Sequence, residues 1–258
     1  MPTDSKVIAV IPARWASSRF PGKPLALING KPMVQWVFEQ TRKAESVSEV
    51  IVATDDDRIL KAVNGFGGNA VMTSVNHDSG TDRIAEVVRD RECEVVVNVQ
   101  GDEPLIAPEN IDRVVNPLLE GVTESTVTLR ILIKTCEELM DRNITKVVVD
   151  RSNSALYFSK APIPWDRDKW GGDSIQYSSF DPLKSFWYKH IGLYAYRKKF
   201  LMEFGDLPES GLEKIEKLEQ LRILEGGFKI KVIETDIDSI GVDCEADLAI
   251  IEKHLAAV

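Results

Sequence analysis

Short apolar runs rich in β-branched residues alternate along the chain with longer segments whose apolar residues recur at helical spacing. The runs that predict buried strands in the first half of the chain are 7–11, 50–54, 70–73 and 95–99. The segments that predict amphipathic helices begin near residues 32, 58, 84 and 108. Strands that alternate with helices indicate βαβ units, and therefore an α/β fold with a mostly parallel sheet covered by helices on both faces.

The second half of the chain continues this pattern with less regularity. It predicts strands at 126–133, 186–196 and 229–233, a hairpin at 146–150 and 155–158, and helices at 136–141, 211–225 and 245–256. In the helix at 211–225, Glu216 and Gln220 share one face because they lie four residues apart. The polar stretch 166–185 has no clear periodicity. Three interpretations of it stay open: a surface loop, a lid, or a subunit contact.

Composition narrows the class of protein. The 258 residues are 43% hydrophobic with a formal net charge of -9, which suits one large domain with a sizeable core. The acidic balance excludes non-specific nucleic-acid binding, which needs a basic face. Three cysteines without close spacing indicate a reducing compartment. There is no signal-peptide pattern and no apolar run of membrane-spanning length, so we expect a soluble cytoplasmic protein without a membrane partner.

The loop that follows the first predicted strand concentrates positive charge among small residues. Pro12 is expected to end the strand, and Arg14, Arg19 and Lys23 follow it. Guanidinium and ammonium groups on such a loop favour polyphosphate binding, although a solvated basic surface loop fits the same composition. The loop is not the P-loop of the NTPases, because Pro24 rather than Ser or Thr follows Lys23.

Two further turns carry candidate chemistry. The strand at 95–99 leads into Gln100 and Asp102, and a carboxylate at the end of a buried strand is either a Mg²⁺ ligand or a turn residue. Thr81 is a plausible cap for the helix near 84, and the small residues Ser79 and Gly80 before it permit either an anion contact or an ordinary turn.

Several motifs resemble one family. The pattern I-P-A-R-x-x-S-x-R-x-P-G-K-P-L at 11–25 is similar to the signature loop of the 3-deoxy-manno-octulosonate (Kdo) cytidylyltransferase family. The resemblance continues in H-x-S-G-T-D-R at 77–83, N-V-Q-G-D-E-P at 98–104, A-L-Y-F-S-K-A-P-I-P-W-D-R at 155–167, H-x-G-L-Y at 190–194 and L-E-x-I-E-x-L-E-Q-L-R at 212–222. Lys160 stands where the family commonly has arginine, and Cys244-Glu245 replaces its Thr-Pro pair.

The resemblance implies a Rossmann-like nucleotidyltransferase fold in a single domain over 1–258, with 154–200 as an inserted, strand-rich sugar-binding and dimerisation lobe. It assigns nucleotide binding to Pro12, Ala13, Arg14, Ser17, Arg19, Lys23, Ser79, Gly80, Thr81 and Arg83. It assigns sugar binding to Gln100, Lys160, Arg167, His190, Tyr194, Glu216 and Gln220. Asp102 and Asp243 are the implied Mg²⁺ ligands, and Arg14, Lys23 and Asp102 the implied catalytic residues.

The implied reaction joins CTP to an eight-carbon 3-deoxy-2-ulosonic acid for lipopolysaccharide biosynthesis, releasing pyrophosphate, in a homodimer that uses Mg²⁺. Two alternatives stay open at this point. One is the same reaction on the 8-amino analogue of Kdo or on a sialic acid. The other is a non-catalytic nucleotide-binding protein that keeps the fold.

Overall fold

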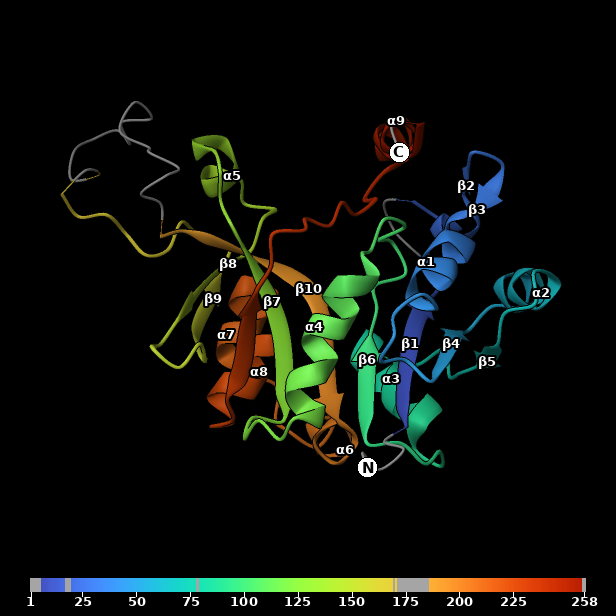
Figure 1. Cartoon of the computed structure of the whole chain (residues 1–258), viewed down its shortest axis with the longest axis horizontal. Helices are drawn as coiled ribbons and strands as arrows, with labels where there is room; N and C mark the ends of the chain where they lie inside the picture. The colour runs from blue at the N-terminus through green and yellow to red at the C-terminus, as the bar shows by residue number, and fades with distance from the viewer. Residues whose placement is uncertain (1–5, 17–19, 78, 169, 171–185, 257–258) are drawn as a thin grey trace. The chain divides into compact units, whose positions relative to one another are not determined.

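The structure is a computed structural model that describes residues 6–16, 20–77, 79–168, 170 and 186–256 (Figure 1). The chain divides into two compact units. The first comprises 1–123, 193–205 and 239–258, and the second comprises 124–192 and 206–238. The single domain over 1–258 and the inserted lobe at 154–200 stay predictions.

The first unit is organised around strand β1 (Val7–Ala13), which pairs in parallel with two neighbours, β4 (Glu49–Thr54) and β6 (Val95–Asn98). Strand β5 (Ala70–Met72) continues the parallel sheet beside β4, and the end of β10 (Tyr188–Arg197) runs antiparallel to β6. Residues 7–11 of β1 and 95–97 of β6 are fully buried, as their continuous apolar runs predict. The predicted mostly parallel sheet is therefore confirmed.

Helices cover this sheet. Helix α1 (Met33–Thr41) packs beside α4 (Pro108–Leu119), and α3 (Gly80–Val88) packs beside α6 (Lys198–Phe204). The unit also contains α2 (Asp57–Gly65), α9 (Leu248–Ala256), the short β2 (Leu27–Ile28) and β3 (Lys31–Pro32), and the 3-10 turns η1 (Lys23–Leu25) and η4 (Glu245–Asp247). In the part of the chain that the structure describes, no helix has the length and apolar character to cross a membrane.

The expectation that Pro12 ends the first strand is wrong, because β1 continues to Ala13. Val10 accepts a hydrogen bond from Val99 N–H, so even-numbered residues of β1 direct their backbone groups toward β6. Pairing with β6 stops at Val10, whereas pairing with β4 continues to Ala13. The N–H that Pro12 lacks therefore falls where no ladder bond is required, and the strand tolerates the proline.

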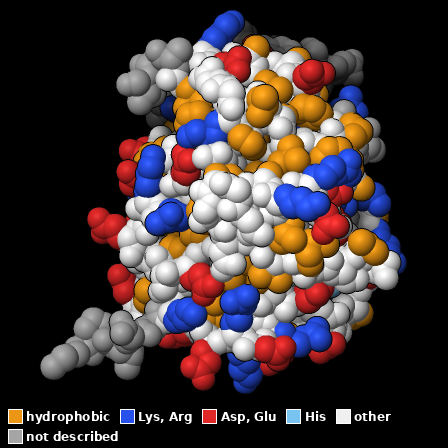
Figure 2. Space-filling view, turned by 90° about the vertical axis from the view of Figure 1, so that its right-hand side faces the viewer, with side chains coloured by type: hydrophobic (Ala, Val, Ile, Leu, Met, Phe, Trp, Pro, Cys, Tyr) orange, Lys and Arg blue, Asp and Glu red, His pale blue; other side chains and the backbone are white. Residues whose placement is uncertain are grey.

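A hydrophobic cluster under α9 holds the segment that carries Asp243. Val242 and Ile251 are buried in it together with Ile28 and Met33, and Leu248 and Leu255 of α9 pack against it. Figure 2 looks at the side of the first unit that carries α2, β2 and β3, where hydrophobic side chains gather between charged ones. This packing fixes the chain next to Asp243, although α9 is far in sequence from β1 and β6.

The second unit contains the parallel pair β7 (Thr126–Leu132) and β11 (Ile230–Glu234) and the predicted hairpin of β8 (Lys146–Val149) and β9 (Ala155–Ser159). The beginning of β10 pairs antiparallel with β8. Its helices are α5 (Cys136–Met140), α7 (Gly211–Glu216) and α8 (Gln220–Glu225). Trp170 stacks on Trp187, with 5.0 Å between ring centroids, inside a small core with Ile133 and Leu139.

The single helix predicted at 211–225 is wrong, because the chain forms two short helices there. Lys217 ends α7 in the left-handed conformation, with φ 57°, and α8 begins at Gln220. Glu216 and Gln220 therefore do not share one face of one helix. The apolar stripe is also incomplete, because Ile215 is 81% exposed. Hydrophobic periodicity continues across this break, so the pattern by itself does not reveal it.

We predict that Gly101→Ala destabilises the first unit. A β-carbon at Gly101 would lie 2.6 Å from the carbonyl oxygen of Pro12, which is backbone and cannot rotate away. Forcing the two strand ends apart should cost about 1–3 kcal/mol of unfolding free energy, measured by urea denaturation. Gly65→Ala is the matched control, because its β-carbon would meet no atom within 4 Å. Equal stabilities of the two variants would contradict this account.

Candidate functional site

A cavity of about 300 Å³ opens at the carboxyl ends of β1 and β6, within the first unit. Because these strands are parallel neighbours, the residues that follow them meet at one edge of the sheet, the usual ligand position in open α/β sheets. The cavity is lined by Pro12, Ala13, Arg14, Lys23, Pro24, Met33, His77, Ser79, Gly80, Arg83, Gln100, Gly101, Asp102 and Asp243.

The loop after β1 folds back so that Lys23 lies in this cavity. Gly22 adopts a left-handed conformation, with φ 72°, and its N–H donates to the carbonyl of Trp15 over 3.1 Å. The Trp15 ring lies against Gly22, 2.7 Å from where a β-carbon would stand, and the guanidinium of Arg58 stacks on that ring. A residue with a side chain at position 22 would clash here, so glycine is required for the loop to close.

Lys23 joins three segments that are far apart in sequence. Its Nζ donates to Oδ2 of Asp102 over 2.6 Å and to the carbonyl of Val242 over 2.8 Å. The N–H of Val242 donates in turn to the carbonyl of Asp102 over 2.9 Å. Asp102 and the residue before Asp243 are therefore hydrogen-bonded neighbours, and both aspartates line the same cavity.

The backbone around Asp243 is held by Asp247. One carboxylate oxygen of Asp247 accepts the N–H groups of Asp243 and Cys244, over 2.8 Å and 2.9 Å. The bond from Cys244 N–H is the main reason that the pKa of Asp247 lies below its usual value. Cys244 is the N-cap of η4 and the Asp247 side chain accepts its N–H, so these two residues cap the turn that leads into α9.

The N-terminus of α3 also reaches the cavity. Ser79 is its N-cap and accepts a hydrogen bond from the N–H of Asp82, whereas Thr81 lies buried within the first turn. Thr81 is therefore not the cap, and it is absent from the cavity lining given above. Gly80 packs against Pro12, which brings the positive end of the helix dipole to the end of β1.

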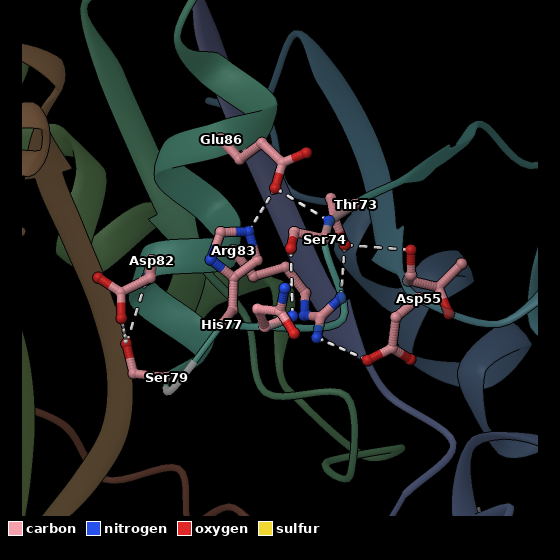
Figure 3. A network of polar contacts seen from close by, with 10 residues as sticks. Asp55, Thr73, Ser74, His77, Ser79, Asp82, Arg83 and Glu86 are labelled. Carbon is pink, nitrogen blue, oxygen red and sulfur yellow. Dashed lines mark hydrogen bonds and ion pairs between the residues drawn. The ribbon is translucent and has the colours of Figure 1, made fainter.

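Arg83 is buried in a polar network behind this helix end (Figure 3). Its guanidinium pairs with Asp55 over 2.7 Å and donates to the hydroxyl of Thr73, which donates to the carbonyl of Thr54. Asp55 follows β4, so the network ties Arg83 to a strand neighbouring β1. The guanidinium is oriented by two partners and cannot rotate without losing both.

The same network anchors the turn before α3. Glu86 accepts hydrogen bonds from His77 and from the N–H of Ser74, so the chain from 74 to 77 is held onto the helix (Figure 3). Burial raises the pKa of Glu86, but its hydrogen bonds outweigh burial and leave that pKa below the usual value. His77 thereby becomes part of the cavity wall.

Two predicted sugar contacts in the second unit, Lys160 and Glu216, hold the turn after β9. The carboxylate of Glu216 accepts the hydroxyl of Ser159 over 2.6 Å and the N–H of Lys160 over 2.9 Å. The fully buried Lys146 donates to three carbonyls, one of them that of Lys160, and burial lowers its pKa. The ammonium of Lys160 donates to the carbonyl of Asn143.

His190 and Tyr194 both lie on β10, as predicted. The Nε2 of His190 is 3.0 Å from the hydroxyl of Thr128, and the ring meets Phe158 edge to face. Tyr194 is buried and stacks on Tyr196, with 5.8 Å between ring centroids. Loss of solvation, helped by the charge of Lys160, lowers the pKa of His190 to about 3.

The predicted residues thus divide into three sets. The cavity brings together most of the implied nucleotide-binding residues, both implied metal ligands and Gln100. Apart from Tyr194, which is in the first unit, the remaining implied sugar contacts belong to the second unit, where Arg167 is exposed and Gln220 is buried. Ser17 and Arg19, and residues 171–185 of the loop at 166–185, lie outside the described residues.

Sequence reasoning missed several members of the site. Four residues line the cavity without having been proposed as contacts, namely Pro24, Met33, His77 and Gly101. His77 and Gly101 belong to motifs that resemble the family, so a signal for them was present. The sequence around Met33 showed only the periodicity of a buried helix face. That periodicity does not distinguish a core residue from one that lines a cavity.

We predict that the stability of the protein falls on mild acidification because of His190. Its folded pKa of about 3 lies below the ordinary 6.5, so the unfolded state binds the extra proton between these values. Unfolding free energy should therefore drop from about pH 7 to about pH 5, before most carboxylates titrate. His190→Gln should flatten this part of the urea-denaturation profile. An equally steep loss in that variant would refute the assignment.

The relatives of this chain are named for one activity. A family model described as Cytidylyltransferase matches residues 8–232. A 3-deoxy-manno-octulosonate cytidylyltransferase of Geotalea daltonii is 53% identical over 94% of this chain and 95% of its own length. A protein of the same name from Geobacter sulfurreducens is 53% identical over 96% of this chain and 98% of its own length.

Solved structures agree with these relatives. A CMP:2-keto-3-deoxy-manno-octonic acid synthetase complexed with CTP matches with a TM-score of 0.88 at 40% identity, over 98% of this chain and 99% of its own. A 4-diphosphocytidyl-2C-methyl-D-erythritol synthase from Anaerococcus prevotii, 14% identical over 98% of this chain and 99% of its own, shares the fold with a TM-score of 0.62. The chain therefore belongs to the cytidylyltransferase family, and within it to the 3-deoxy-manno-octulosonate cytidylyltransferases.

Proposed function

We propose that this chain transfers the cytidylyl group of CTP to an eight-carbon 3-deoxy-2-ulosonic acid, Kdo, and releases pyrophosphate. The curated relatives named above carry this sugar acid in their names, and the similar solved synthetase was complexed with CTP. The observation that carries the proposal is the meeting of Lys23, Asp102 and the segment before Asp243 in one cavity.

The nucleotide would take up the cavity between the loop after β1 and the end of α3. Arg14 and Lys23 offer cations to a triphosphate, and the N–H groups at the start of α3 favour an anion or a base edge. Arg83 supplies N–H donors that Asp55 and Thr73 already orient. A group oriented before binding loses little entropy on contact, which suits the recognition of one base among four.

The donor set at Asp102 and Asp243 fits Mg²⁺. Among the described residues no group of three or more His, Cys, Asp or Glu side chains is placed to hold a metal ion. Two carboxylates completed by phosphate oxygens and water are nonetheless the usual ligands of Mg²⁺ in nucleotide enzymes. Held by Asp102 and Asp243, Mg²⁺ would neutralise phosphate charge and lower the pKa of the attacking hydroxyl.

The reaction itself needs alignment rather than a protein nucleophile. The anomeric hydroxyl oxygen of the sugar forms a bond to the α-phosphorus of CTP, and its proton passes to water. The bond from that phosphorus to the bridging oxygen breaks, and its electron pair leaves with pyrophosphate. Arg14 and Lys23 would stabilise the charge that accumulates on the departing group, which is how phosphoryl transfer is usually accelerated. From the family resemblance we also propose a homodimer as the working form.

An assay of pyrophosphate release tests this function. CTP with Kdo should give faster turnover than the other three nucleotides, and faster than CTP with the 8-amino analogue or with a sialic acid. Asp102→Asn should lower kcat/KM for CTP by at least about 10³-fold while the protein stays folded, because the amide neither carries the charge for Mg²⁺ nor pairs with Lys23.

The matched control is Asp90→Asn, which changes an exposed aspartate away from the cavity. Its kcat/KM should equal that of the unaltered protein. Near-normal turnover of Asp102→Asn at saturating Mg²⁺ would overturn the role of Asp102. Release of no pyrophosphate from any pair of substrates would overturn the proposed function as a whole.

We predict that Asp55→Asn weakens discrimination between the cytosine base of CTP and the base of UTP. The substitution removes the charge that orients the buried Arg83, so the KM for CTP should rise about tenfold and the preference for CTP over UTP should shrink. The ratio of the two kcat/KM values does not depend on how much of the protein is folded. Asp57→Asn is the control, because Asp57 is exposed in the first turn of α2 and does not line the cavity. An unchanged nucleotide ratio in Asp55→Asn would refute this role.

A further inference from the structure

The ammonium of Lys23 binds one of the two carboxylates that are proposed to hold the metal. It donates to Oδ2 of Asp102 and to the carbonyl of Val242, the residue before Asp243, over 2.6 Å and 2.8 Å. The side chain of Lys23 is 15% exposed and that of Asp102 is 35% exposed, so the pair lies at the cavity wall rather than in the core. The structure thus seats a cation of the protein itself on a proposed metal ligand.

We propose that Lys23 is an internal competitor of the divalent cation, which it excludes from Asp102 until a triphosphate binds. This inference rests on the proposed function, in which Asp102 and Asp243 hold Mg²⁺. In the nucleotide-free protein, Lys23 neutralises Asp102 and lowers its affinity for the metal. The triphosphate oxygens then draw the ammonium away, and the carboxylate becomes available to the cation.

The chemistry of the two cations supports an exchange of partners. A divalent ion and an ammonium bound to the same carboxylate would repel each other, so the two cations compete for Asp102. Lysine suits this role, because its charge sits at the end of a flexible four-carbon chain and has no fixed planar geometry. The backbone that carries Lys23 does not need to move, since it is held by the turn at Gly22 and by the buried Pro24.

Thermodynamic linkage gives the inference a measurable form. If the triphosphate removes a competitor from Asp102, it raises the affinity of the protein for the metal, and the metal raises the affinity for the triphosphate by the same factor. Removing the ammonium should raise the metal affinity of the nucleotide-free protein and reduce this coupling. A lysine that served merely to stabilise the fold would have neither effect.

The experiment uses Mn²⁺ as the probe and measures its binding to the full chain by electron paramagnetic resonance, with and without CTP and without sugar. Lys23→Met should bind Mn²⁺ about tenfold more tightly than the unaltered protein when CTP is absent, and CTP should raise its affinity by a smaller factor. Lys23→Gln is a second variant in case the first does not fold. Misfolding cannot imitate a gain of affinity.

Two controls locate the effect. Lys31→Met removes a lysine that pairs with Glu39 and stacks on Trp36, and it should leave Mn²⁺ affinity unchanged. Adding Asp102→Asn to Lys23→Met should abolish the gain. Unchanged or weaker Mn²⁺ binding by both Lys23 variants, while the unaltered protein binds Mn²⁺ with CTP, overturns the competition alone. Failure of the unaltered protein to bind Mn²⁺ even with CTP overturns both the competition and the proposed metal site.

Discussion

The parallel pairing of β1 with β6 is the constraint on which the site depends. Their register places Val10 opposite Asn98, so the loop after Ala13 and the turn through Asp102 emerge at the same edge. The turn passes so close to Pro12 that position 101 has no room for a β-carbon. Glycine is therefore required at position 101, because the backbone of β1 leaves no room for a side chain. The positions of Lys23 and Asp102 follow from the pairing of β1 with β6.

Two of the cations that line the cavity are neutralised by carboxylates of the same protein. The chain is acidic overall, yet its cavity concentrates Arg14, Lys23 and Arg83. Lys23 is neutralised by Asp102 and Arg83 by Asp55, whereas Arg14 is exposed. Paired cations keep their geometry in the nucleotide-free protein and lose little freedom when an anion replaces the internal partner. Arg83 and Lys23 differ in this respect, because a planar guanidinium with two oriented bonds stays in place and a single ammonium can change partner.

Some of the differences between expectation and structure have one cause. Pro12 was expected to end β1, Thr81 to cap α3, and residues 211–225 to form one helix. In each case the sequence pattern located the element correctly. It did not show where the element begins, ends or breaks, because backbone geometry decides that. Pro12 faces the side where β6 no longer pairs, Ser79 is the residue that meets the N–H of Asp82, and Lys217 takes a left-handed conformation that divides the helix. Hydrophobic periodicity is blind to all three.

The sequence by itself determined the order of strands and helices, the mostly parallel sheet and the family, because buried β-branched runs, helical periodicity and short motifs are local properties of the chain. It also predicted Lys23 and Asp102 as site residues, and both line the cavity. Only the tertiary structure decided that Lys23 bridges Asp102 to Val242, that Asp55 holds Arg83, and that Glu216 binds the turn at Ser159 and Lys160. These contacts join residues distant in sequence, which no local pattern records. The contacts of Lys23 depend on the register of β1 with β6 and on the packing of Val242 under α9.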